Sequence, residues 1–351
     1  MSLIVTVTMV SGCKKNNTDV SSELNKSDIE ETSQDMTESG IEDSDVGSQS
    51  AEETAETEST EQTESDFEEN TEQIETDAGQ EETQNPYIRQ KEPYTGVPIY
   101  ENLERIYMNT TWEYADHSAI SDGYAVLYKA SGQRKNIVVG VNAGHGTAGG
   151  SAVRTLCHPD GSLKSTGGST AAGAATATAV SGGMTFYDGT PESEVTLKMA
   201  EILRDKLLSE GYDVLMIRDG SDVQLDNVAR TVMANNKADC HIALHWDSTK
   251  TDKGAFYMSV PNNAAYRAME PVASNWESHN KLGSALVGGL KQNGVKIFSS
   301  GSMEMDLTQT SYSTVPSIDI ELGDGKSAHD DATLGKLADG LVVGVNSYFG
   351  Q

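Results

Sequence analysis

The apolar residues after position 136 follow two alternating patterns. Short continuous apolar runs, such as IVVGV at 137–141, are typical of strands that are covered on both faces of a sheet. Longer segments, such as 331–349, repeat apolar residues at helical spacing. Strands that alternate with helices in this way predict an α/β fold, with a single largely parallel or mixed sheet flanked by helices.

The boundaries of these elements follow from the same patterns. The predicted strands are 137–141, 213–217, 240–244, 254–260, 295–298 and 316–321. The predicted helices are 191–210, 225–237, 280–292 and 331–349. For the first helix, Thr190 suits the N-cap, Pro191 the first turn and Gly211 the position just after the end.

Residues 86–136 have a mixed composition with several tyrosines and prolines. We expect this approach segment to pack on the domain as an extended strap. Within it, DGYAVLYKASG at 122–132 predicts a short edge strand followed by a turn. The pattern assigns the segment no function.

Charge separates the N-terminal part from the rest. Residues 14–85 hold 24 acidic residues against three lysines, which is −21 of the total −29. Such a segment cannot bury enough apolar surface to offset its ordering entropy, so it predicts a disordered acidic linker. An acidic chain also argues against nucleic acid as a partner. The remaining residues, 86–351, suffice for one large domain, and we expect its catalytic part to span 137–351.

The first thirteen residues, MSLIVTVTMVSGC, are too short an apolar run to span a bilayer as a helix. Their end resembles the bacterial lipobox, which implies a signal peptide and a lipid-modified Cys13. The alternatives are a plain secretion signal and a buried apolar N-terminus. The remaining cysteines, Cys157 and Cys240, are too few for a disulfide framework, which favours two free thiols over a single bridge.

Three residues with metal-binding chemistry follow or end predicted strands. His145 comes after 137–141 between two glycines, His245 follows 240–244, and Glu321 ends 316–321. Sites in such sheets form at the carboxyl ends of the strands, so these side chains are expected at one edge. The alternative for each histidine is a structural hydrogen-bonding role. His241 lies about 13 Å from His245 along a strand, so both cannot bind one ion.

Helical phase selects a fourth residue. Glu192 shares a stripe with Val195, Met199 and Ile202, whereas Glu194 falls on a polar stripe. We therefore expect Glu192 to face inward and Glu194 to face water. A carboxylate in the first turn could instead simply complement the helix dipole.

Together these motifs resemble the zinc-dependent N-acetylmuramoyl-L-alanine amidases, which cleave bacterial peptidoglycan. The likeness covers roughly 137–349 and rests on GHG after a strand, a glutamate opening the next helix, and P-x-x-x-x-E-L-G near the end. It is most specific in VLMIRDGSDVQLDNVARTVMANNKADCHIALHWDS, whose arginine, R-x-x-x-A-N, A-D and I-x-H positions match in order and spacing.

The resemblance implies zinc bound by His145, Glu192 and His245, with Glu321 as the catalytic carboxylate. Arg218 and Arg230 match the same run, and for Arg230 we expect a salt bridge or cap rather than substrate contact. The sequence departs from the family at Asn142, where an aspartate is usual, and at 147–189, a long insertion rich in Gly, Ala, Ser and Thr. This insertion is either a surface excursion or a lid that shapes the substrate site.

The resemblance thus implies a monomeric amidase that uses zinc to hydrolyse the bond between N-acetylmuramic acid and L-alanine. Its partners would be peptidoglycan and, through Cys13, the membrane. It would lie outside the cytoplasm, lipid-anchored and facing the cell wall. Two alternatives stay open: a cell-wall-binding module without turnover, and a zinc hydrolase that acts on another amide.

Overall fold

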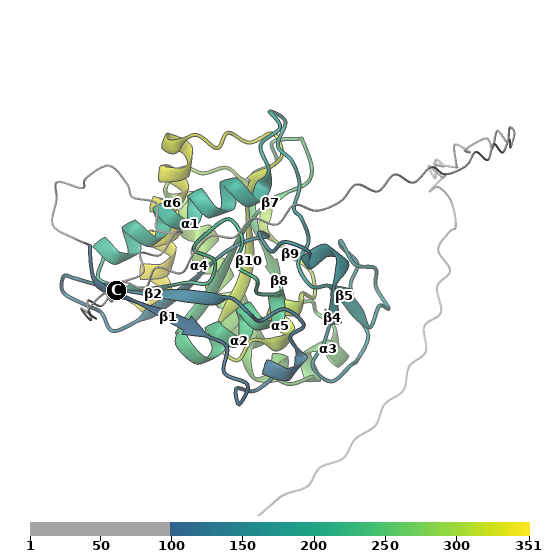
Figure 1. Cartoon of the computed structure of the whole chain (residues 1–351). Helices are drawn as coiled ribbons and strands as arrows, with labels where there is room; N and C mark the ends of the chain where they lie inside the picture. The colour runs from purple at the N-terminus through teal and green to yellow at the C-terminus, as the bar shows by residue number, and fades with distance from the viewer. Residues whose placement is uncertain (1–98) are drawn as a thin grey trace, which may run out of the picture. The chain divides into compact units, whose positions relative to one another are not determined.

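An eight-stranded sheet runs through residues 99–351, the part of the chain that the computed structural model describes (Figure 1). Its strands lie in the order β1-β2-β6-β3-β7-β10-β8-β9. The central strands are all parallel and comprise β6 (Asp213–Met216), β3 (Val138–Ala143), β7 (Cys240–Asp247) and β10 (Ser317–Asp324). The predicted α/β fold with a mixed sheet is confirmed.

Both flanks of the sheet contain antiparallel pairings. On one side β2 (Tyr124–Ala130) pairs with β6, and β1 (Tyr100–Tyr107) pairs with β2. On the other side β8 (Ala255–Ser259) pairs antiparallel with β10 and parallel with β9 (Ile297–Glu304). The strand predicted within 122–132 is confirmed as β2, but its predicted place at the edge was wrong, because β1 takes the edge. Most β1 side chains are exposed, so its sequence lacks the apolar alternation that marks a strand.

Helices cover both faces of the sheet (Figure 1). One face carries α1 (Glu192–Ser209), α4 (Val272–Gln292) and α6 (Asp331–Phe349), whose apolar sides pack on alternate strand residues to form the main core. The other face carries α2 (Asn227–Lys237) and α5 (Thr308–Tyr312). The short helix α3 (Ala264–Ala268) precedes α4.

Several predicted boundaries shift in the structure. Helix α6 has the predicted bounds, but α4 begins at Val272 instead of 280. Val272 is buried, but the polar residues that follow it hide the apolar period of this first part of the helix. Strands β7 and β10 continue to Asp247 and Asp324, which pair with each other. Consequently His245 lies within its strand rather than after it, and Glu321 lies within its strand rather than at the end.

The ends of α1 illustrate one correction and one confirmation. Pro191 has an extended backbone, with ψ 139°, so it takes the N-cap position in place of Thr190 and makes no side-chain capping bond. Gly211 follows the helix at φ +88°, a conformation that favours glycine. A Cβ there would lie 2.2 Å from the carbonyl oxygen of Gln133, so the turn requires glycine.

The predictions for the signal peptide with Cys13 and for the linker 14–85 lie outside the described residues, as does the start of the approach segment 86–136. Within residues 99–351, no helix combines the length and the apolar character needed to cross a bilayer. Cys157 and Cys240 are buried free thiols, which confirms that they are not bridged.

Candidate metal centre

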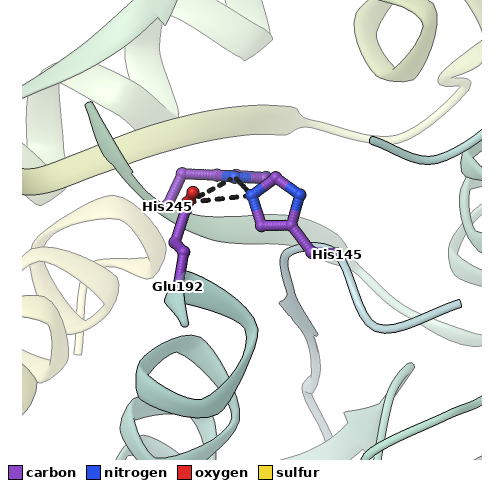
Figure 2. A group of neighbouring side chains, drawn as sticks. All are labelled: His145, Glu192 and His245. Atoms are coloured by element: carbon purple, nitrogen blue, oxygen red, sulfur yellow. Dashed lines mark hydrogen bonds and ion pairs between the residues drawn. The ribbon is translucent and has the colours of Figure 1, made fainter. Parts of the chain in front are cut away.

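Three predicted side chains meet at the carboxyl end of the central strands (Figure 2). His145 Nε2 lies 2.9 Å from Glu192 Oε1 and 3.1 Å from His245 Nδ1. His245 Nδ1 lies 3.3 Å from Glu192 Oε1. Among residues 99–351, this is the group of His, Cys, Asp and Glu side chains close enough to share one metal ion.

His145 is held in place by the turn that follows β3. Its φ of +66° is unusual for a residue with a side chain and turns the ring toward α1. The neighbouring Gly144 is required, since a Cβ there would lie 2.3 Å from Cε1 of His245. His145 Nδ1 donates to the carbonyl of Ser181 at 2.9 Å, which leaves Nε2 as the nitrogen that faces the other two residues.

Glu192 opens α1 and is only 2% exposed, whereas Glu194 is exposed. The helical phase deduced from the sequence is therefore confirmed. Glu192 Oε1 accepts from the backbone N–H of Trp246 at 3.0 Å, and Oε2 accepts from that of Met184 at 2.8 Å. These two bonds fix the carboxylate so that one oxygen faces both histidines.

The three side chains perturb one another electrostatically. Burial alone would raise the pKa of Glu192, but hydrogen bonds with His145 and His245 hold it well below its usual range. Burial lowers the pKa of His145. Burial also acts to lower the pKa of His245, but Glu192 and Asp319 outweigh it and raise the pKa to about 9. The centre thus holds an ionised carboxylate beside a protonated histidine. A divalent cation could replace the proton on His245 and bind both groups.

Glu321 lies beside His245 on the neighbouring strand. The two residues are in register across the parallel β7–β10 ladder, so their side chains leave the same face of the sheet. Both line a cavity of about 590 Å³. Glu321 Oε2 is buried and has no hydrogen-bond partner among the described residues, and burial raises the pKa of this carboxyl to about 8.

Asp319 also lines this cavity, and sequence reasoning did not single it out. Its Oδ2 lies 4.0 Å from His245 Nε2. The signal was present in PSIDIE, because alternation along a strand places residues two apart on one face. Reading Glu321 as a cavity residue therefore implied the same for Asp319.

The insertion 147–189 forms another wall of the cavity. It contains a 3₁₀ turn (Gly150–Ala152) and a small antiparallel pair, β4 (Arg154–Leu156) with β5 (Thr176–Thr178). Lys164 Nζ bonds the carboxylate and the carbonyl of Asp306, which ties the insertion to the segment after β9. Together with the bonds from Ser181 and Met184, these contacts join the insertion to the metal centre.

Comparison with known proteins identifies the family. The family model of the N-acetylmuramoyl-L-alanine amidases matches residues 139–345. The chain belongs to this amidase family.

Solved amidase structures are similar to this chain at low identity. The amidase Ami1 of Mycobacterium smegmatis is 19% identical, with 61% of this chain and 97% of that chain covered and a TM-score of 0.49. An amidase of Clostridium difficile 630 is 18% identical, with 61% and 97% covered and a TM-score of 0.45. AmiC2 of Nostoc punctiforme is 15% identical, with 62% and 99% covered and a TM-score of 0.44. No curated protein matches the chain.

In this amidase two buried arginines support the turn that carries His145. Arg230 donates to the carbonyl of His145 at 2.6 Å and to Oδ1 of Asn142 at 3.1 Å. Arg218 donates to the carbonyls of Gly144 at 3.0 Å and Ser193 at 2.9 Å, so it connects this turn to the start of α1. The expectation of a salt bridge or cap for Arg230 was wrong, because the buried guanidinium instead fits the carbonyl oxygens of a tight turn.

The other histidines of the amidase domain lie apart from the centre. His241 is buried with Nδ1 3.2 Å from Ser317 Oγ, and His279 Nδ1 accepts from the backbone N–H of Ser317 at 2.9 Å. His158 Nε2 lies 3.5 Å from Asp306. These contacts are structural, as expected for His241.

Proposed function

We propose that this chain is a zinc-dependent amidase that hydrolyses the bond between N-acetylmuramic acid and L-alanine in peptidoglycan. Membership of the amidase family supports the class of reaction. The observation that carries the proposal is the cluster of His145, Glu192 and His245 beside the unpartnered Oε2 of Glu321.

The donor set fits zinc. Zinc in proteins is held by histidine nitrogens and carboxylate oxygens at about 2.0–2.2 Å, and tetrahedral geometry then separates neighbouring donors by about 3.3 Å. The donor atoms here are 2.9, 3.1 and 3.3 Å apart. Two neutral imidazoles and one carboxylate also leave the ion with a net positive charge, which a Lewis acid needs.

His145, Glu192 and His245 would hold the metal, and the backbone would hold these residues. The carbonyl of Ser181 fixes the tautomer of His145, and the N–H groups of Met184 and Trp246 orient Glu192. When bound, zinc would lower the pKa of a water molecule to about 7 and polarise the scissile carbonyl.

Glu321 would carry the proton. Its buried, unpartnered Oε2 can take a proton from water in the cavity as the water oxygen bonds the carbonyl carbon of the amide. It then gives that proton to the amide nitrogen as the carbon–nitrogen bond breaks. The products are a carboxylate on the muramic acid side and the free amino group of L-alanine.

The insertion would shape the substrate side of the cavity. Lys164 fixes it to Asp306, and its residues Ser181 and Met184 bond two of the proposed zinc ligands. These contacts favour a substrate-shaping loop over a surface excursion. The C-terminal part of the insertion therefore helps to set the geometry of the proposed metal centre.

Digestion of purified peptidoglycan tests the proposed reaction. The zinc-loaded chain should release stem peptides that begin with a free L-alanine amino group, detected by mass spectrometry, while the glycan strands stay intact. Glu321→Gln should keep zinc and release no peptide. Glu304→Gln, at an exposed position on β9, is the matched control and should act as the unaltered chain does.

The two alternatives give different products. Binding to peptidoglycan without release of any fragment, at every enzyme concentration, would indicate a cell-wall-binding module. Release of acetate in place of stem peptides would indicate hydrolysis of an N-acetyl group. Either result contradicts the proposed reaction.

We also propose that the chain works outside the cytoplasm, because that is where peptidoglycan lies. A lipid on Cys13 would hold it at the membrane. Detergent phase partitioning of the unaltered chain and of Cys13→Ala tests this proposal, which predicts that only the unaltered chain enters the detergent phase.

A further inference from the structure

A second carboxylate on β10 has no role in the reaction as proposed. Asp319 lies two residues before Glu321, so both side chains leave the same face of the strand. Across the ladder Asp319 is paired with Ala243, two residues before His245. Asp319 therefore lies next to the metal centre and lines the same cavity.

The carboxylate of Asp319 is poorly satisfied. Its Oδ1 is buried and has no hydrogen-bond partner within residues 99–351. Its Oδ2 lies 4.0 Å from Nε2 of His245, the charged group that faces it. A buried carboxylate oxygen without a hydrogen-bond donor raises the free energy of the folded state. A contact with the ring of His245 would lower this cost.

The tautomer of His245 supplies the missing donor. Its Nδ1 faces His145 Nε2 and Glu192 Oε1, at 3.1 and 3.3 Å, and is the nitrogen that would bind zinc. A metal-bound imidazole carries its proton on the other nitrogen, which here is Nε2. Oδ2 of Asp319 lies 4.0 Å from that nitrogen.

The two histidines thus differ in the group next to the ring nitrogen that would not bind the metal. His145 has the neutral carbonyl of Ser181 at 2.9 Å, whereas His245 has a carboxylate. A carboxylate behind a histidine fixes the ring orientation and makes the opposite nitrogen a stronger donor to the metal.

We propose that Asp319 is a positioning residue that orients His245 and strengthens its bond to the metal. The inference rests on the proposed zinc site. The 4.0 Å separation exceeds a direct hydrogen bond, so the contact runs through one water molecule or closes by a small rotation of the Asp319 side chain. Asp319 does not touch the reacting atoms and is not a catalytic residue.

Zinc affinity tests the role of Asp319 separately from turnover. Competition with a chromophoric chelator at pH 7.5 should show about 10–100-fold weaker zinc binding for Asp319→Leu, as is typical when the outer partner of a metal ligand is removed. Asp319→Asn keeps an acceptor but loses the charge, so its affinity should fall between those of Asp319→Leu and the unaltered chain.

Glu321→Gln is the matched control for a neighbouring carboxyl group. It replaces the carboxyl on the same face of the same strand, two residues away, and should change zinc affinity less than threefold. Asp319→Leu that binds zinc as tightly as the unaltered chain overturns the proposal. An equal loss in Glu321→Gln also overturns it, because the effect would then be general electrostatics.

Two further measurements exclude other causes. Asp319→Leu should lower the unfolding temperature more in the zinc-loaded chain than in the metal-free chain, where only the 4.0 Å contact with the His245 ring is lost; an equal loss in both forms would make the role structural and contradict the proposal. The absorption spectrum of the cobalt-loaded Asp319→Asn should match that of the unaltered chain, and a changed band would instead make Asp319 a ligand. If the unaltered chain binds no zinc, the proposed function itself fails.

Discussion

Replacement of Arg230 by methionine should destabilise the protein and weaken the metal centre together. Arg230 is fully buried, and burial lowers the pKa of its guanidinium to about 9. It bonds oxygens of Leu225, Asn142, Ala143 and His145. Methionine is of similar length but donates no hydrogen bond.

The expected loss of stability in Arg230→Met depends on which hydrogen-bond acceptors are left without any donor. The carbonyl of Ala143 keeps Arg218, and that of Leu225 keeps the hydroxyl of Thr147. The carbonyl of His145 and Oδ1 of Asn142 lose theirs, at about 1–3 kcal/mol each. Oγ1 of Thr147 also loses a bond from Arg230, but it is half-exposed and can accept from water instead. Removing a buried charge recovers part of this cost. We therefore expect a net loss of about 2–4 kcal/mol, out of about 5–15 kcal/mol for a domain.

Guanidinium unfolding followed by circular dichroism measures this loss in the metal-free and zinc-loaded forms. The loss should be larger with zinc, because the turn that holds His145 at φ +66° would lose one of its two arginine supports. Arg105→Met, on the exposed edge strand, should change stability by less than about 0.5 kcal/mol. A loss below 1 kcal/mol in Arg230→Met, or an unchanged zinc affinity, would refute this reasoning.

Three further predictions concern the ligands, the buried histidines and the insertion. Glu192→Ala should lose zinc, measured by atomic absorption after dialysis, while Glu194→Ala should retain it; equal zinc content in both would contradict the inward orientation of Glu192 as a ligand. Burial lowers the pKa of His241 to about 3 and of His279 to about 4, both below the unfolded value of about 6.5. The unfolded chain then binds more protons, so stability present above pH 6.5 is lost as pH falls toward 4, by about 2 kcal/mol per histidine at pH 5. Chemical unfolding against pH tests this, and the slope in this range should fall by about one proton in His279→Gln; an unchanged slope would refute the assignment. Lys164→Met should release the insertion, seen as faster amide hydrogen exchange in 147–189, and exchange equal to that of the unaltered chain would contradict the tie to the segment after β9.

The sequence predicted the centre because its residues obey two simple rules. Strand carboxyl ends share one edge of a parallel sheet, which brought His145 and His245 together, and the helical period distinguished Glu192 from Glu194. Both rules depend on backbone geometry alone. They therefore hold even though the residues lie far apart along the chain.

The parts that sequence reasoning missed depend on tertiary contacts. Arg230 looked like a polar helix residue, yet the turn after β3 offers it a set of carbonyl oxygens that no periodicity reveals. The insertion is rich in Gly, Ser and Thr and has no apolar period, so its path follows from bonds such as that between Lys164 and Asp306. Strand β1 was also missed, because most of its residues are exposed and its sequence has no apolar alternation.

The most direct test of the account is an anomalous difference map, recorded at the zinc absorption edge from crystals of the zinc-loaded chain. We expect one peak at about 2.0–2.2 Å from each of His145 Nε2, Glu192 Oε1 and His245 Nδ1. Glu321 should lie near this peak without binding it. A peak at other residues, or no peak between the two histidines, would contradict the proposed zinc centre.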